Sequence, residues 1–225
     1  MPISRKLAFF QRIIMSSKAQ KVIDYYLLCH TLKDTIRTGW QVWNVKRDRL
    51  ESIAEHIYGV QMLAIAMKSE YQYDIDLTKV IFMLASHELG ETVIGDLTQF
   101  EIDKADKEKA EHAAVHKILA DLLDGEQIEA LFLEFDAHET PEAKFAYQCD
   151  KLECDLQCKL YDEENYVDLT DQADNKIMQD ARVKKLLEAG DSWSKMWLKF
   201  SQQAYPYDKN FRAVSNYAIE HKLQK

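Results

Sequence analysis

Turn-forming residues are scarce in this chain of 225 residues, which has only 6 glycines and 3 prolines. Folds built from many short strands need such residues between the strands, so their scarcity argues against a β fold and favours long helices. The sequence also lacks any run of about 18 apolar residues, and we therefore expect no membrane association. The apolar stretch near the N-terminus is interrupted by Gln11 and Arg12 and has no small-residue cleavage site, so we expect a first helix rather than a signal peptide.

Positive charge is also in short supply, because 29 Lys and Arg residues stand against 38 Asp and Glu residues, a net charge of −9. Proteins that bind polymeric nucleic acid need a basic face, and no block of Lys or Arg occurs here. We therefore predict no polymeric nucleic acid partner. A small anionic substrate such as a nucleotide stays compatible with this charge, because a pocket sets its own local potential.

Cysteine is present at four positions, Cys29, Cys149, Cys154 and Cys158. The last two are separated by about one helical turn, which is not the spacing of a zinc ribbon. We interpret the four as buried, reduced thiols of a cytoplasmic protein. A redox or zinc-binding role is the alternative.

Apolar residues recur at steps of three and four along the whole chain, as is typical of amphipathic helices. We expect helices near residues 3–15, 18–34, 51–70, 76–90, 104–122, 125–137, 141–163, 173–189, 191–203 and 206–222. The stretch 35–50 is the one long irregular piece. Because no repeat or flexible linker divides the sequence, we predict a single all-α domain over residues 1–225.

Three of these helices carry polar side chains on the same face as their apolar residues: His56 in 51–70, His87 and Glu88 in 76–90 with Glu91 just beyond its end, and Asp150 in 141–163. A lone inward histidine is usually a hydrogen-bonded core residue. Several buried carboxylates are costly, however, and a divalent cation is an economical partner for them together with histidines. A buried ion-pair network with Arg37, Arg47 or Lys151 stays open as the alternative from spacing alone.

Four strings in this region resemble the HD-domain hydrolases: RTGW (Arg37–Trp40), ESIAEH (Glu51–His56), HELGETVIGDLT (His87–Thr98) and CDKLE (Cys149–Glu153). Within that group they look like the 5'-deoxynucleotidases specific for nucleoside monophosphates. Their order and spacing agree over a motif core of about 35–161, which leaves a C-terminal helical extension of about 163–225. The resemblance implies an HD-type helical bundle and, in keeping with the family, a homodimer.

The resemblance also implies roles for individual residues. One divalent metal ion (Mn²⁺, Co²⁺, Mg²⁺, Zn²⁺ or Fe²⁺) would be held by His56, His87, Glu88 and Asp150. Glu91 would position or activate the attacking water, Arg37 would bind the substrate phosphate, and Asp96 would lie near the nucleotide. Trp40 or Trp43 would form either a wall for the sugar or base or part of the core. Lys151 would be a surface or outer charge, because its neighbour Asp150 faces inward, and His112, His116, His138 and His221 look solvated.

One position departs from the family pattern, because the doublet is His87-Glu88 where the family has His-Asp. Glu still offers an oxygen to a cation, but its arm is one methylene group longer. We expect an active phosphohydrolase of a nucleoside (deoxy) 5'-monophosphate. The alternatives are an HD hydrolase of another phosphate ester, such as a cyclic nucleotide or guanosine polyphosphate, and a catalytically silent HD domain that binds a nucleotide or partner protein.

Overall fold

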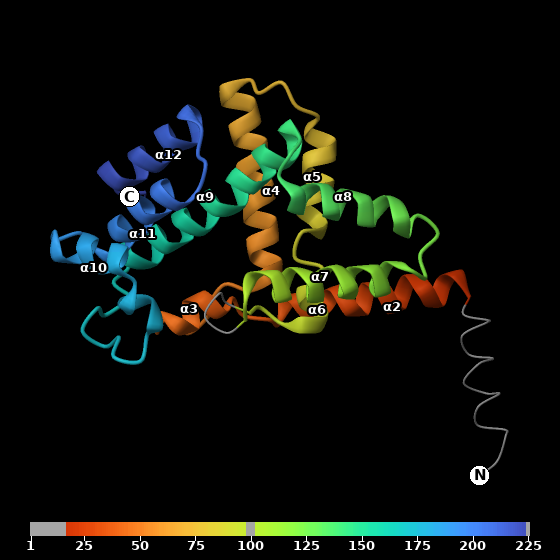
Figure 1. Ribbon diagram of the computed structural model, residues 1–225, viewed down its shortest axis with the longest axis horizontal. Helices are drawn as coiled ribbons and strands as arrows, with labels where there is room; N and C mark the ends of the chain where they lie inside the picture. Colours follow the sequence, from red (N-terminus) through yellow and green to blue (C-terminus); the bar gives the residue numbers. More distant parts are fainter. Residues whose placement is uncertain (1–16, 98–101, 224–225) are drawn as a thin grey trace, which may run out of the picture.

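The computed structural model describes residues 17–97 and 102–223. Helices dominate this part of the chain (Figure 1), which contains no strand and only one isolated antiparallel bridge, between Ile36 and Ser52. The all-α prediction is therefore confirmed. The expected helix near 3–15 lies outside the described residues, as does Thr98 at the end of the third motif. None of the described helices is both long and apolar enough to cross a bilayer.

The described α-helices run in the order α2 (Lys18–His30), α3 (Thr38–Val42), α4 (Ile53–Tyr71), α5 (Leu77–Ser86), α6 (Glu91–Ile94), α7 (Lys104–Leu119), α8 (Gly125–Ala137), α9 (Pro141–Glu163), α10 (Ala181–Glu188), α11 (Trp193–Ala204) and α12 (Lys209–Glu220). Two 3-10 turns, at Thr31–Lys33 and Lys176–Gln179, complete the order.

Helix α9 is the central element of the fold, since it contacts α4, α5, α8, α11 and α12. Figure 1 shows it running diagonally across α4, which is antiparallel to α5, with α10 to α12 gathered at one end and α2 and α7 along the other side. Its start is strongly specified. The Thr140 hydroxyl accepts from the Ala143 amide, and Pro141 occupies the first turn, where its missing N–H costs nothing.

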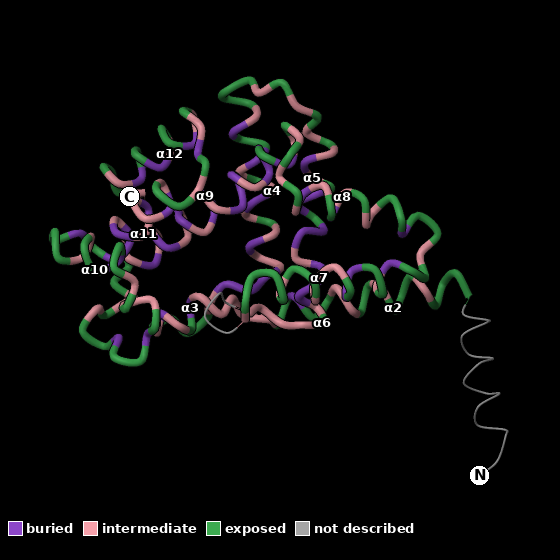
Figure 2. Tube along the Cα trace, in the orientation of Figure 1, coloured by how far each residue is buried: buried purple, intermediate pink, exposed green. Residues whose placement is uncertain are grey.

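The core of the described residues consists of three apolar clusters. Figure 2 marks the buried residues along the helices. The largest fills the space between α4, α5, α9 and α12 and includes Val60, Leu84 and Phe145. A second cluster joins α3, α9, α10 and α11 around tryptophans, and a third lies between α7 and α8. The C-terminal helices are therefore packed against α9 rather than appended to it.

The expected helix 76–90 is shorter in the structure, because α5 ends at Ser86 and α6 begins at Glu91. The Ser86 hydroxyl donates to the Met83 carbonyl, and the His87 ring bonds to the Leu84 carbonyl. Such side-chain bonds compete with continuation of the helical ladder. The His87-Glu88 doublet therefore lies in a turn between two helices. Elsewhere, the expected irregular stretch 35–50 contains the short helix α3.

Candidate metal centre and active site

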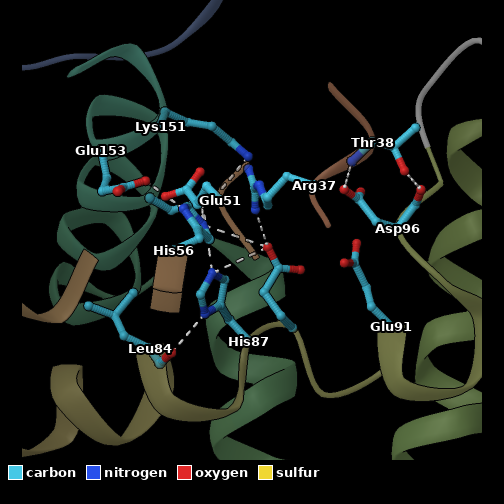
Figure 3. A network of polar contacts seen from close by, with 12 residues as sticks. Arg37, Thr38, Glu51, His56, Leu84, His87, Glu91, Asp96, Lys151 and Glu153 are labelled. Carbon is cyan, nitrogen blue, oxygen red and sulfur yellow. Dashed lines mark hydrogen bonds and ion pairs between the residues drawn. The ribbon is translucent and has the colours of Figure 1, made fainter. Parts of the chain in front are cut away.

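Four side chains from α4, from the turn after α5 and from α9 converge at one point: His56, His87, Glu88 and Asp150 (Figure 3). One ligand atom from each lies within 4.8 Å of the others. His56 Nε2 is 3.1 Å from Asp150 Oδ1 and 3.7 Å from Glu88 Oε1. His87 Nε2 is 3.6 Å from Glu88 Oε1 and 4.0 Å from Asp150 Oδ1. All four sequence-predicted ligands thus meet in one place.

The outer nitrogen of each imidazole has its own partner, which fixes the ring orientation. His87 Nδ1 is 2.8 Å from the Leu84 carbonyl oxygen, which can only accept, so Nδ1 carries the hydrogen and Nε2 keeps its lone pair. His56 Nδ1 is 2.6 Å from Glu153 Oε2. Metal-binding histidines commonly use their second nitrogen in this way. Both Nε2 atoms therefore face the centre of the cluster.

The hydrogen bonding of the four side chains leaves a place for a cation. His87 Nε2 is buried and has no hydrogen-bond partner among the described residues. An unpaired buried polar atom is uncommon and calls for an explanation. A divalent cation beside two imidazole nitrogens and two carboxylates would supply that partner, and a mixed nitrogen and oxygen set suits zinc, iron, cobalt or manganese. The residues present therefore fit a metal ion.

Burial and charge set the protonation of this cluster. Burial lowers the pKa of His87 below its usual value, which favours the neutral, ligating form. Burial and the charge of Arg37 also lower the pKa of His56. Its hydrogen bonds with Asp150 and Glu153 outweigh both and raise the pKa to about 9. Burial opposes ionisation of Glu88, yet His87 and Arg37 lower its pKa to about 2. Glu88 is thus a carboxylate at neutral pH.

Arg37 is held against this cluster just before α3. Its Nη1 donates to Glu88 Oε1 at 2.9 Å, and its backbone amide donates to the Glu51 carbonyl at 3.1 Å. Asp96 fixes the same segment from the other side, since its Oδ2 accepts from the Thr38 amide at 2.6 Å. The Thr38 hydroxyl in turn donates to the Asp96 carbonyl, also at 2.6 Å. The structure thus places Asp96 where it anchors the loop that carries Arg37.

Glu91 is the first residue of α6, and its carboxylate points toward the cluster (Figure 3). The side chain is buried, Oε1 lies 3.2 Å from Lys107 Nζ, and Oε2 has no hydrogen-bond partner among the described residues. Burial, with the nearby charges of Glu88 and Asp96, raises its pKa to about 9. With this pKa Glu91 is protonated at neutral pH, and a cation bound at the neighbouring cluster would favour its carboxylate form.

Trp40 is placed in the core and not against the site. It is 1% exposed, and its indole Nε1 donates to Glu51 Oε2 at 2.8 Å. Its ring packs against Tyr161 and Trp197, with centroids 5.2 and 5.6 Å away. Neither face of the ring is accessible to a sugar or base. Of the two roles expected for the tryptophans, Trp40 therefore has the role in core packing.

A cavity of about 330 Å³ opens over the cluster. The cavity is also lined by Lys151 of the CDKLE motif and by residues that the motifs do not include: Lys104, Lys107, Glu108, Glu111, Phe132, Phe135, Asp136, His138 and Tyr147. Lys151 was expected to point away from the site, but its Nζ lies 2.8 Å from Asp150 Oδ2. Its long, flexible side chain allows this contact. His138, expected in solvent, lines the cavity, and His112 bonds Asp136 at 2.6 Å.

Comparison with known proteins agrees with this geometry. The family model for the HD domain matches residues 29–206, most of the chain. This chain belongs to the HD domain family. The 5'-deoxynucleotidase hdd1 of Schizosaccharomyces pombe is 30% identical over 154 residues, covering 65% of this chain and 75% of that protein. The human 5'-deoxynucleotidase HDDC2 is 27% identical over 148 residues, covering 64% and 70%.

Solved structures share the fold. A protein of Pyrococcus horikoshii superposes with a TM-score of 0.64 at 24% identity, covering 88% of this chain and 98% of that one. A predicted metal-dependent phosphohydrolase of Magnetospirillum magnetotacticum gives 0.63 at 21% identity, covering 92% and 95%. Both likenesses extend past the motif core into the C-terminal helices, so those helices are part of the shared fold.

Proposed function

We propose that this chain is a metal-dependent phosphohydrolase that releases phosphate from nucleoside 5'-monophosphates, deoxynucleotides included. The observation that carries the proposal is the convergence of two inward-facing imidazole nitrogens and two carboxylates on the wall of a cavity that Arg37 and Glu91 also line. The names of the relatives in yeast and human support the choice of substrate.

We assign the metal site to His56, His87, Glu88 and Asp150. A divalent cation bound there supplies positive charge for the phosphate and lowers the pKa of a bound water. The fit rests on the ring orientations, because the Leu84 carbonyl and the Glu153 carboxylate already hold both Nε2 atoms toward the centre. The identity of the metal is a matter for metal analysis of the purified protein.

Arg37 and Glu91 are assigned to the substrate and to the proton. The planar guanidinium of Arg37 has five N–H donors, and its Nη1 donates to Glu88. The remaining donors can bind phosphate oxygens. A cation at the metal site would favour the carboxylate form of Glu91. Its Oε2, buried and without a hydrogen-bond partner among the described residues, is then suited to accept a proton from the attacking water. We assign Asp96 to anchoring the segment that carries Arg37. We assign no substrate contact to Trp40, because it is buried in the core.

The test combines metal analysis with phosphate release from a panel of nucleoside and deoxynucleoside 5'-monophosphates, 3'-monophosphates, cyclic nucleotides and guanosine polyphosphates. We expect about one metal ion per chain and activity confined to 5'-monophosphates. Asp150→Asn should lose metal and activity together, whereas His116→Gln, at a histidine whose side chain is 72% exposed, should keep both. Preference for a cyclic nucleotide or polyphosphate would contradict the substrate assignment. A folded native protein without metal or activity would identify a silent domain.

A cytoplasmic location and a homodimeric state are proposed as well. All four cysteines are free thiols, as expected for a reducing compartment. The homodimer rests on the family resemblance alone, and light scattering on the purified full chain tests it. A monomer at micromolar concentration would contradict it.

A further inference from the structure

The carboxylate of Glu91 has a partner that none of the motifs includes. Lys107 Nζ lies 3.2 Å from Glu91 Oε1, while Glu91 Oε2 has no hydrogen-bond partner among the described residues. The two oxygens are therefore unequal. One is held by an ammonium group and the other has no such partner, in a side chain that belongs to the cavity lining.

The place of Lys107 is set by the packing of α6 on α7. Lys107 lies in the first turn of α7, and its Nζ is also 3.5 Å from Glu111 Oε1, one turn further along the same helix. The two helices approach closely at Gly90, where a Cβ atom would lie 3.1 Å from Cβ and Cγ of Glu111. The ammonium group is thus held between two carboxylates, with its side chain only 25% exposed.

We propose that Lys107 is a positioning residue for Glu91: it binds Oε1 and so directs Oε2 at the attacking water. The proposal rests on the proposed function, in which Glu91 accepts the proton. Lys107 is a poorer candidate for the substrate phosphate, because two carboxylates already surround its charge. Lys109 lies two residues further along the same helix, is exposed and stands outside the cavity lining, which makes it the matched control.

The experiment measures kcat and KM with a deoxynucleoside 5'-monophosphate at saturating metal, together with metal content. We expect Lys107→Met to lower kcat about 10- to 100-fold, as misplacement of a reacting group does, with KM and metal content nearly unchanged. Lys107→Arg should restore most of the rate, because it keeps the charge and the hydrogen bond. Lys109→Met should leave kcat within about twofold of the native value.

A double-mutant cycle separates this role from any other. If Lys107 acts only through Glu91, Lys107→Met should lower kcat by less than about twofold in a Glu91→Gln background. An equal loss in both backgrounds would overturn the proposal. A raised KM with unchanged kcat in Lys107→Met would overturn it too, and would make Lys107 a phosphate-binding residue.

Crystal structures of the native protein and Lys107→Met give a readout that does not depend on activity. We expect the Glu91 carboxylate to leave its position in Lys107→Met while the α6 and α7 backbones stay in place. An unmoved carboxylate would overturn the proposal even if the native enzyme were active. A native protein without metal or activity would refute the proposed function instead, and the crystal comparison would still decide whether Lys107 holds Glu91.

Discussion

Shortening Glu88 by one methylene group probes the departure of this chain from the family doublet. Glu88 Oε1 lies 2.9 Å from Arg37 Nη1, 3.6 Å from His87 Nε2 and 3.7 Å from His56 Nε2. Glu88→Asp withdraws the carboxylate by about 1.5 Å, the length of one C–C bond. The shorter arm cannot reach both the arginine and the histidines unless the backbone moves.

The size of the effect follows from the contact that is lost. A hydrogen bond between charged groups contributes about 1.5–3 kcal/mol to stability. In a domain of this size about 1 kcal/mol shifts Tm by roughly 2–4 °C, so metal-free Glu88→Asp should melt roughly 3–12 °C below the native protein. A loss of similar size at the metal would weaken its binding about 10- to 100-fold.

Competition against a chromophoric chelator measures the metal dissociation constant, and thermal melting with and without Mn²⁺ measures the stability. Glu88→Gln is the matched control, because it keeps the length of the arm and removes only the charge. Unchanged Tm and equal or tighter metal binding in Glu88→Asp would refute the reasoning. If folded native protein bound no metal and released no phosphate with Mn²⁺, Co²⁺, Mg²⁺ or Zn²⁺ while Glu88→Asp bound metal, Glu88 would mark a silent domain.

Three further substitutions test the remaining assignments. Glu91→Gln should keep the metal content and lower kcat about 100-fold or more, since only proton transfer is lost, and parallel loss of metal would make Glu91 a ligand. Arg37→Lys should raise KM for a 5'-monophosphate, because an ammonium group cannot replace the planar fork, and unchanged kinetics would leave Arg37 as a loop-packing residue. Glu153→Gln should weaken metal affinity about 10- to 100-fold in a folded protein, as loss of a partner behind a ligating histidine does. Metal affinity equal to the native value would assign Glu153 to packing alone.

Helix boundaries were predictable where capping residues mark them. The expected helix 141–163 coincides with α9, which begins at the Thr140 cap and Pro141. The expected helix 125–137 coincides with α8, although Asp124 before it makes no side-chain capping bond. The expected helix 76–90 was too long, because bonds from Ser86 and His87 to backbone carbonyls end α5 early. Periodicity continues across such a break, so only the atomic contacts reveal it.

The four candidate ligands could be named from inward-facing positions and motif order, whereas the places of Lys104 and Lys107 in the cavity lining could not. The run 103–111 looks like a solvated helix face, and nothing local distinguishes Lys107 from its neighbours. Its role depends on α6 packing against α7, a tertiary contact. The placement of Trp40 likewise depends on Trp193 and Trp197, which lie more than a hundred residues away in the sequence.

The orientation of the His56 ring is set by residues of α9 and by a glycine of α4. Asp150 and Glu153 lie on the same face of α9 and contact the two nitrogens of His56 from either side, at 3.1 and 2.6 Å. On α4, Gly59 leaves the space that Glu153 needs, because a Cβ atom there would lie 2.4 Å from Glu153 Oε1. The packing of α4 on α9 therefore fixes the ring of His56 without help from a metal ion. A cation that binds here meets an imidazole already in position, which reduces the entropy that metal binding must overcome.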